Sequence, residues 1–543
     1  MTITVPTGHT AAPGPAADGP RVRTSYTLSM VARTPIHVGG ASPSGDVTAD
    51  LVLARDGLGR LYLPGTSLAG VLRQAIVRLL PADEHDVDLL FGRRVRRAEP
   101  GRGDGDRTEA STSLTTVADA VVTPAGPIEV RTGVGIDRYT GAAADRIRYD
   151  RQVIPAGSTL DVLLRYDGPD DDQLWLLDQL VGAVRHSGLR VGAATRRGLG
   201  HLACTAATRR HTDLRSRSSL LARLSGTDDA TDVEPVAVEG DELRISVGWH
   251  PARPVVVGAA ATGDGEALTP MTTLAGDPSA PVPTIPGSAI RGVLRSAAER
   301  IARTLCDPAA TWDADGPAGP DLVAASADLA DRIPAIAGLF GTAERAGALT
   351  VADLVADVGP PPTHDPPADG APHWSRQRTH VALDRWTGAA ADELLFTVEE
   401  TQAVRWPPLH VAVDLPQLGL ALPDTEGWSS TDRCRAAVVL LGLAVGLLVE
   451  GTVGLGHSTT RGLGDVDVYS FHIRTTTAGF TDTQFEGEPD DTTNSPADGD
   501  GGEDNGRAGG PRPVEAAWWA WLRQTAPPGD WTDALAAGHR SLR

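Results

Sequence analysis

The sequence predicts an α+β protein that consists of two tandem copies of one module. Two observations support this prediction. Five phrases of the first half return in the same order in the second half, and each half mixes strand-like segments with two long helix-like segments. The length of 543 residues also suits two mixed domains of roughly 200–250 residues each. A conserved order of phrases indicates duplication, because chance similarity does not preserve order.

The repeated phrases are long enough to align the two copies. IDRYTGAAAD at Ile136 returns as LDRWTGAAAD at Leu383, and LPGTSLAGVLR at Leu63 returns as IPGSAIRGVLR at Ile285. The remaining pairs are LFG at 90–92 and 339–341, TVAD at 116–119 and 350–353, and RGLG at 197–200 and 461–464. This alignment assigns residues 21–212 to module 1 and residues 242–474 to module 2, with a polar linker at 213–241.

Each element of module 1 follows from a local pattern. Residues 25–38 alternate polar and apolar side chains, which predicts a strand, and residues 50–65 predict two short strands around a D-G-x-G turn. Residues 66–80 start with Thr and Ser and continue with apolar residues at helical spacing. A second helix is expected within residues 170–192, ended by a Ser-Gly pair. The combination predicts a ferredoxin-like sheet with its helices on one face.

The two ends of the chain differ from the modules in composition. Residues 1–20 lack a basic start followed by an apolar core, so they predict disorder rather than a signal peptide. Residues 475–513 are acidic and rich in Gly and Pro, which also predicts disorder. Residues 514–543 contain clustered tryptophans and predict short helices. These helices would either cover their own module or dock on a partner, and both possibilities stay open.

Composition excludes several functional classes. The net charge of −21 argues against a general nucleic-acid binder, although arginines cluster locally, and the absence of lysine excludes a Walker A loop. Three scattered cysteines have no zinc-site spacing, and they favour a reducing, cytoplasmic location. The apolar run that starts at Ala436 is interrupted by Glu450, which favours a buried helix over a membrane span.

Several residues stand in patterns that suit phosphate or base binding. Glycine pairs expose backbone N–H groups, hydroxyls at a helix start bind anions, arginine forks match phosphate oxygens, and aromatic rings stack on bases. The candidates are His37, Gly39, Gly40, Thr66, Ser67, Arg73, Arg138, Tyr139, Arg196, Arg197, Ser288, Arg291, Arg295, Arg385, Trp386 and Arg461. Ordinary turns, helix caps, solvated arginines and core aromatics would explain the same residues without a ligand.

Taken together, the phrases resemble the RAMP proteins of type III CRISPR effector complexes, and most closely their backbone subunits. The family signatures are an HIGG turn, an IPGSSLKGKLR helix start, LFG, IDRxTG and a glycine-rich loop. Here they read HVGG, LPGTSLAGVLR, LFG, IDRYTG and RRGLG. The resemblance implies two RAMP modules, each a modified RRM or ferredoxin-like fold with a thumb hairpin, expected near residues 133–155 and 381–407.

The resemblance also implies partners and a role in antiviral defence. The expected partners are a CRISPR guide RNA, a complementary target RNA and other type III effector subunits, with no membrane. In the family's helix start, lysines stand where module 1 has Ala69 and Val71, whereas Arg291 keeps one basic residue in module 2. Guide contacts from that part of module 1 are therefore in doubt.

Members of this family cut target RNA with an aspartate between the glycine turn and the P-G-S helix start. Counting back from Pro64 places Asp50 at that position. The resemblance thus implies a metal-dependent endoribonuclease in which Asp50 orients the 2′-hydroxyl or holds Mg²⁺ or another divalent cation. In module 2 the same count reaches Met271 or Thr272, so we expect module 2 to be inactive unless a loop shift brings in Asp264 or Glu266. A non-catalytic RNA scaffold and a duplicated small-ligand-binding protein are the alternatives.

Overall fold

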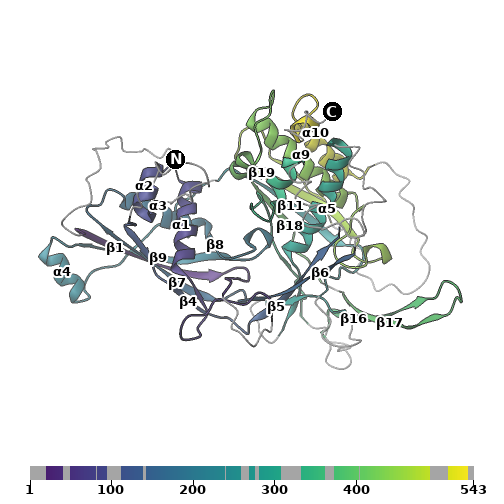
Figure 1. Cartoon of the computed structure of the whole chain (residues 1–543), viewed down its shortest axis with the longest axis horizontal. Helices are drawn as coiled ribbons and strands as arrows, with labels where there is room; N and C mark the ends of the chain where they lie inside the picture. Colours follow the sequence, from purple (N-terminus) through teal and green to yellow (C-terminus); the bar gives the residue numbers. More distant parts are fainter. Residues whose placement is uncertain are drawn as a thin grey trace, which may run out of the picture.

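The computed structural model describes residues 20–40, 49–80, 82–93, 112–137, 142–238, 240–258, 268–274, 280–306, 332–360, 372–402, 404–488 and 511–535. Two modules lie side by side, each with an antiparallel sheet and covering helices (Figure 1). Nearly all of the segment predicted at 1–20, and residues 489–510 of the acidic segment, lie outside the described residues.

Module 1 is organised around strand β1 (Val22–Ala32), which pairs with β7 (Thr159–Gly168) on one side and β9 (His201–Asp213) on the other. Burial alternates along β1 because one face of the sheet packs against helices α1 (Gly65–Leu79) and α3 (Leu174–Ser187). The other elements are β2 (Tyr62–Leu63), α2 (Glu84–Phe91), β3 (Thr115–Val117), β4 (Ala120–Thr123), β8 (Leu189–Arg190), η1 (Thr195–Arg197), α4 (Arg217–Leu224) and β10 (Thr231–Asp232).

The strand order β9-β1-β7-β3 is that of a ferredoxin-like sheet, which confirms the predicted fold class. Both predicted helices of module 1 are present, and α3 ends at Gly188, whose φ of 73° is easily adopted only by glycine. The linker is attached to module 1, since β10 pairs with β9 and the backbone N–H of Val236 donates to the carbonyl of Gly182.

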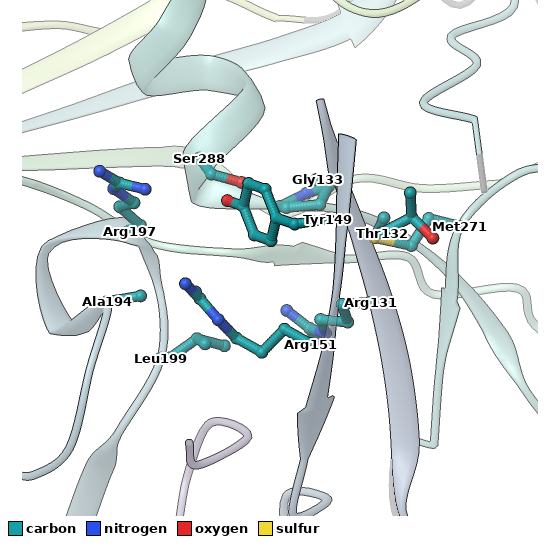
Figure 2. A pocket seen from close by; sticks show the side chains of 11 residues that line it. Arg131, Thr132, Gly133, Tyr149, Arg151, Ala194, Arg197, Leu199, Met271 and Ser288 are labelled. Atoms are coloured by element: carbon teal, nitrogen blue, oxygen red, sulfur yellow. The ribbon is translucent and has the colours of Figure 1, made fainter. Parts of the chain in front are cut away.

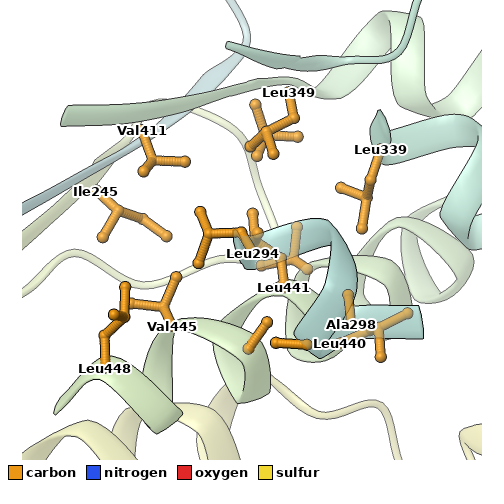
Figure 3. Packing of buried hydrophobic residues seen from close by; sticks show 14 of the residues in the cluster. Ile245, Leu294, Ala298, Leu339, Leu349, Val411, Leu440, Leu441, Val445 and Leu448 are labelled. Atoms are coloured by element: carbon orange, nitrogen blue, oxygen red, sulfur yellow. The ribbon is translucent and has the colours of Figure 1, made fainter. Parts of the chain in front are cut away.

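Module 2 repeats this plan with β11 (Glu242–Pro251) between β18 (Leu409–Asp414) and β19 (Val466–Thr475). Helices α5 (Gly287–Cys306) and α9 (Ser430–Val449) cover its sheet, and Figure 3 shows Leu294 of α5 and Leu441 of α9 facing Val411 of the sheet. The other elements are β12 (Thr272–Thr273), β13 (Val282–Ile285), α7 (Pro334–Phe340), β14 (Leu349–Val351), β15 (Leu354–Val355), α8 (Leu415–Ala421), η3 (Thr459–Arg461) and β20 (Thr483–Phe485).

Helix α9 is the apolar run noted in the sequence, and it is buried on nearly every side. Among the residues that the structure describes, no helix is both long and apolar enough to cross a membrane. Helices α10 (Pro513–Thr525) and α11 (Thr532–Leu535) pack against α9. Trp518 and Trp521 are buried there, and the indole N–H of Trp518 donates to the carbonyl of Gly442 at 3.0 Å. The tryptophan-rich helix therefore covers its own module.

Each module carries a two-stranded hairpin at the position of the repeated phrase. Thumb 1 consists of β5 (Glu129–Ile136) and β6 (Ala143–Val153), and thumb 2 consists of β16 (Ser375–Leu383) and β17 (Ala390–Thr401). In Figure 1 thumb 1 extends from module 1 to the underside of module 2, whereas thumb 2 projects beyond the body of the protein. The two hairpins confirm the thumb of the predicted fold class.

Candidate nucleic-acid interface

Thumb 1 is held on module 2 by an ion pair between Arg131 and Asp353. Nη1 of Arg131 lies 2.5 Å from Oδ2 of Asp353, and the two side chains are only 8% and 3% exposed. The other oxygen of Asp353 accepts the backbone N–H of Gly287, the first residue of α5, at 2.8 Å. Beside this pair, Glu129 of thumb 1 accepts hydrogen bonds from the hydroxyl of Thr273 and from a backbone N–H of module 2. One aspartate thus ties the thumb to a helix start.

The glycine-rich loop of module 1 lies against the same aspartate. Gly198 follows η1 with a φ of 96°, and a Cβ atom on it would overlap the carboxylate of Asp353. Both the backbone conformation and the close contact therefore require glycine at this position. The neighbouring Arg196 reaches module 2, where it donates to the carbonyl of Ala348 at 3.2 Å and lies 3.4 Å from the carboxylate of Asp414. The loop and thumb 1 therefore form one junction between the modules.

A small open hollow of about 40 Å³ lies in this junction (Figure 2). Its size corresponds to roughly three water molecules. Thumb 1, the η1 loop and the start of α5 all contribute to it, and its lining residues are Arg131, Thr132, Gly133, Tyr149, Arg151, Ala194, Arg197, Leu199, Met271, Pro286 and Ser288. The hollow suits one phosphate group better than a complete nucleotide.

Positive charge accumulates around the hollow. Nε of Arg151 is buried without a hydrogen-bond partner, and the guanidinium of Arg151 lies 5.4 Å from the centre of the Tyr149 ring. Burial lowers the pKa of Arg151, and the cation of Arg197 lowers it further, whereas Tyr149 opposes the shift. Burial lowers the pKa of Arg291 to about 9, and nearby arginines, foremost Arg197, act in the same direction. An anion in the hollow would relieve this repulsion.

Two further groups favour an anion at this place. The side chain of Arg197 is exposed, and no described residue forms a hydrogen bond with its guanidinium. Ser288 is exposed in the first turn of α5, where a hydroxyl and the positive end of the helix dipole meet. Arginine forks, a hydroxyl and a helix start are groups that bind phosphate.

Asp50 lies at the base of thumb 1. Its Oδ2 accepts the backbone N–H of Asp150 at 2.8 Å, and the next residue, Leu51, forms a parallel bridge with Arg151. Asp150 is a second carboxylate at this site, and it accepts the hydroxyl of Thr132 at 2.5 Å. The catalytic candidate is therefore held directly beside the strand that lines the hollow.

The carboxylates near Asp50 limit the kind of metal site that is possible. Over the described part of the chain there is no group of three or more His, Cys, Asp or Glu side chains that could hold a metal ion. Asp50 and Asp150 alone suit an ion such as Mg²⁺, which keeps several waters and takes further oxygens from a bound phosphate. A divalent cation at this place would therefore need most of its ligands from water and from a bound phosphate.

The predicted counterpart of Asp50 in module 2 needs a correction. Leu268 forms with Val398 the same parallel bridge that Leu51 forms with Arg151, so Leu268 is the counterpart of Leu51. The residue before it is Ala267, and not Met271 or Thr272 as counting back from the P-G pair suggests. The count failed because module 2 has a longer loop before β13. Ala267, Asp264 and Glu266 themselves lie outside the described residues.

The residues of the HVGG turn hold the chain segments next to Asp50 in place. His37 is only 3% exposed, and its Nδ1 donates to the carbonyl of Gln152 at 2.7 Å. Burial lowers the pKa of His37, the Gln152 carbonyl opposes this shift, and the Arg151 cation adds to it. Gly39 forms a bridge with Leu53, and the N–H of Gly40 donates to the carbonyl of Val52. These groups position the segment that carries Asp50, and they leave no free donor for a phosphate at Gly40.

Three predicted arginines bind within their own module. Arg73 donates to Asp88 and to the carbonyl of Gly92. Arg291 donates to the carbonyls of Leu349 and Phe340, and Arg295 donates to Glu299 and to the carbonyl of Gly341. These side chains tie α1 and α5 to the neighbouring LFG turns. We therefore leave Arg73, Arg291 and Arg295 out of the proposed RNA contacts, together with Arg196.

The remaining candidates that the structure describes are accessible. Thr66 and Ser67 are exposed at the start of α1, Arg461 is exposed on η3, and Arg385 is exposed near the tip of thumb 2. Trp386 is 96% exposed beside it. Arg138 and Tyr139 lie outside the described residues. An RNA-binding role for these residues stays a prediction.

Sequence reasoning did not single out Arg131, Tyr149, Arg151 or Asp353. For Arg131 and Asp353, the repeat itself contained a signal. Arg131 stands five residues before the IDR phrase and Arg378 five residues before LDR, while Asp353 closes a TVAD phrase that also occurs in module 1. A polar residue that recurs at the same repeat position in both copies was the indication that the two copies share a contact.

The profile of the RAMP superfamily matches residues 29–203 and 265–467, which is well over half of the chain. The chain belongs to the RAMP superfamily. Each matched region lies within one module and contains the thumb of that module, so the duplication seen in the sequence is a duplication of a RAMP module.

Among solved structures, a chain of a cryo-EM structure described as the type III-B Cmr-beta complex bound to cognate target RNA is similar to this RAMP protein. The identity is 14% and the TM-score is 0.27, and the match covers 34% of this chain and 60% of the other. The matched part is thus less than two thirds of that chain. No curated protein matches the sequence.

Proposed function

We propose that this RAMP protein is a backbone subunit of a type III CRISPR ribonucleoprotein in antiviral defence, and that it binds guide RNA across the junction of its two modules. The observation that carries the proposal is the positive hollow between thumb 1, the η1 loop and the start of α5. Arg151 has a buried nitrogen without a partner there, and Arg197 and Ser288 complete a phosphate-sized site. The phosphates of RNA carry the negative charge that such a site binds.

The binding experiment measures the affinity of the full chain for single-stranded RNA over a range of salt concentrations. Each phosphate contact that is lost lowers the slope of log K against log salt by about 0.7. Arg151→Ala and Arg197→Ala should each weaken binding and lower this slope. Arg217→Ala is the matched control, because Arg217 is an exposed arginine on α4, far from the junction (Figure 1). Equal slopes for the three variants and the wild type would refute the proposed site.

We further propose that module 1 cuts target RNA through Asp50. The 2′-hydroxyl oxygen of the target attacks the adjacent phosphorus, and its proton passes to the Asp50 carboxylate. The new 2′-O–P bond forms while the bond between phosphorus and the 5′-oxygen breaks. The 5′-oxygen takes a proton from water, so the products are a 2′,3′-cyclic phosphate and a 5′-hydroxyl. The N–H of Asp150 fixes Oδ2 of Asp50, and no described residue forms a hydrogen bond with Oδ1.

Mg²⁺ or another divalent cation, held by Asp50, Asp150 and RNA oxygens, would supply neutralisation of the phosphate charge. Other effector subunits and a complementary guide would place the target beside Asp50. These steps require RNA, because DNA lacks the 2′-hydroxyl.

Cleavage is tested with the assembled complex, its guide and an end-labelled target RNA in Mg²⁺. We expect Asp50→Ala and Asp50→Asn to abolish cutting while target binding is unchanged, and Asp229→Ala, in the linker, to cut normally. A single 2′-deoxy nucleotide at the cut position should block the wild-type complex in the same way. Normal cutting by Asp50→Ala would remove Asp50 from the reaction. An intact target with the wild-type complex would instead favour the non-catalytic scaffold.

The material that copurifies with the chain distinguishes a duplicated small-ligand-binding protein from the two RNA-binding hypotheses. A high ratio of absorbance at 260 nm to that at 280 nm indicates bound nucleic acid. A ratio typical of pure protein, together with no affinity for RNA, would favour the small ligand.

A further inference from the structure

The sheet of module 2 has an outer face, turned away from α5 and α9, with two unlike halves. In Figure 1 the strands of this sheet lie nearer to module 1 than the two helices do. Module 1 covers the half formed by β14 and β18, because Arg196 of η1 reaches the hydroxyl of Thr350 and lies 3.4 Å from the carboxylate of Asp414. On the other half, formed by β11 and β19, the outer residues Arg244 and Arg474 are exposed.

Like charges stand next to each other on this second half. Arg244 of β11 and Arg474 of β19 are directly opposite each other in the strand register, where like charges repel. Arg244 is paired with Glu242 of its own strand at 2.9 Å. No described residue forms a hydrogen bond or an ion pair with Arg474. The described fold therefore leaves one charge of this row without a partner.

Module 1 adds an arginine at the same place. Arg190 of β8 is exposed, and no described residue forms a hydrogen bond with its side chain. The surrounding protein is nevertheless close, because burial lowers the pKa of Arg190. Glu242 opposes this shift, and three arginine cations add to it, those of Arg196, Arg78 and Arg244. Arg190 thus belongs to the same positive region as Arg244.

The nearby carboxylates are already paired with other arginines. Asp414 is 3% exposed and lies 3.0 Å from Arg78 of α1 and 3.4 Å from Arg196 of η1. Glu242 is the partner of Arg244. Within the described residues, Arg190 and Arg474 are left without an acidic partner. An anion from outside the chain would neutralise this excess of positive charge.

Rings lie beside the arginines on the same face. A Cβ atom on Gly248 would overlap the hydroxyl of Ser470 and lie 2.9 Å from the ring of Tyr469, so glycine allows this ring to lie across β11. The ring of His250 stacks beside it, with 6.2 Å between the ring centroids. Tyr469, His250 and the next ring along β19, His472, are all half-buried, so part of each ring stays accessible.

We call these residues the β11–β19 patch: Arg190, Arg244, His250, Tyr469, His472 and Arg474. The patch has an acidic limit, because Glu486 lies 3.9 Å from His472 on the side of β20. An anion is therefore expected at the arginine end of the patch.

The same face of module 1 lacks both features. Its arginines are paired, since Arg23 and Arg165 share Asp167 and Arg210 lies 3.6 Å from Asp228. The outer positions of its central strand β1 contain no ring, being Arg23, Ser25, Thr27, Ser29 and Val31. The β11–β19 patch is thus particular to module 2 and is not a general feature of the duplicated module.

We propose that the β11–β19 patch binds a single-stranded segment of RNA, with phosphates at Arg190 and Arg474 and a base against Tyr469. Arginine forks bind phosphate, and rings on an open sheet stack on bases that are free of a duplex. An acidic protein would use the arginines but would have no need of the rings. The proposal rests on the proposed function only in taking RNA as the ligand, because its residues differ from those of the hollow.

The first experiment measures the affinity of the full chain for a labelled single-stranded RNA by fluorescence anisotropy over a range of salt concentrations. Arg190→Gln with Arg474→Gln should weaken binding and lower the slope of log K against log salt by about 1.4, since each lost phosphate contact contributes about 0.7. The matched control is Arg165→Gln with Arg217→Gln, which removes two arginines from module 1 and should keep the wild-type slope. All four side chains are exposed, so both variants are expected to fold.

The second experiment tests the ring without changing the charge. Tyr469→Leu should weaken binding of single-stranded RNA at least about fivefold, because base stacking is lost. Tyr469→Phe keeps the ring and should bind like the wild type. The same RNA annealed to its complement should bind equally well to Tyr469→Leu and to the wild type, because its bases are already stacked.

The outcomes separate this proposal from the proposed function. A wild-type slope for Arg190→Gln with Arg474→Gln, while Arg151→Ala in the hollow lowers the slope, would overturn the patch as an RNA site and leave the hollow in place. The arginines would then point to an acidic protein partner. A wild-type chain without affinity for RNA would overturn both proposals.

Discussion

Replacing Arg131 with alanine removes one half of a nearly buried ion pair and leaves the other half in place. Arg131 and Asp353 are 8% and 3% exposed, with 2.5 Å between Nη1 and Oδ2. Removing one partner of a buried pair typically costs about 3–5 kcal/mol, because the remaining charge is desolvated and uncompensated. Asp353 keeps the N–H of Gly287, so we expect a loss near the lower limit, about 3 kcal/mol.

The assay is a double-mutant cycle in urea unfolding. It uses Arg131→Ala, Asp353→Asn and the double variant, with tryptophan fluorescence reporting mainly on module 2, which holds most of the tryptophans. Residues in direct contact usually show interaction energies of about 0.5–3 kcal/mol, and we expect a value above the middle of this range. Asp353→Asn is chosen because its amide oxygen still caps α5.

The control pair is Arg253 and Asp465, an exposed pair whose side chains are 61% and 49% accessible. Its coupling should stay below about 1 kcal/mol, since water screens such charges. Additive effects of Arg131→Ala and Asp353→Asn, with no more coupling than the exposed pair, would refute the reasoning that thumb 1 is anchored by this contact.

Three further predictions concern the fold around the site. Gly442→Val should release α10 from α9, because a Cβ atom at position 442 would overlap Leu522 and lie 3.1 Å from the Trp521 ring. Faster proteolysis of the C-terminal helix would reveal this release. Gly198→Ala should lower stability more than Gly462→Ala, since both strain a positive φ but only Gly198 packs against Asp353; equal melting temperatures would contradict this. Burial holds the pKa of His37 below its ordinary value of 6.5 in the folded protein, so the unfolded chain binds the proton first as the pH falls through 6.5. The free energy of unfolding should therefore decrease from pH 7 to pH 5, and His37→Gln should flatten this dependence.

The duplication and the main helices were determined by the sequence alone, and the resemblance to a known family added the approximate places of both thumbs. Helices α1 and α3 follow from apolar spacing, and α3 also from its Ser-Gly stop, and these signals act within a few residues. Thr66 and Ser67 do not cap α1, whose N-cap is Pro64. The thumbs were expected at the repeated phrase because of the family resemblance, and the observed hairpins, at 129–153 and 375–401, begin a few residues before the expected bounds. Local patterns of this kind are readable because neighbours along the chain are also neighbours in a helix or a hairpin.

Which arginines bind within the protein and which stay accessible was decided only by the tertiary structure. Arg196 and Arg197 are adjacent, yet Arg196 binds module 2 while Arg197 lines the hollow, because successive residues of a tight turn project in different directions. Likewise, a longer loop before β13 shifted the counterpart of Asp50 from Met271 to Ala267.

The junction itself is the clearest case. Arg131 and Asp353 are separated by 222 positions in the chain and meet only because two sheets, one hairpin and one helix start are assembled around them. Charge and burial at such a contact depend on distances through space, which a linear sequence does not contain. The sequence determined that two RAMP modules exist, and the packing of one on the other decided where the positive hollow lies.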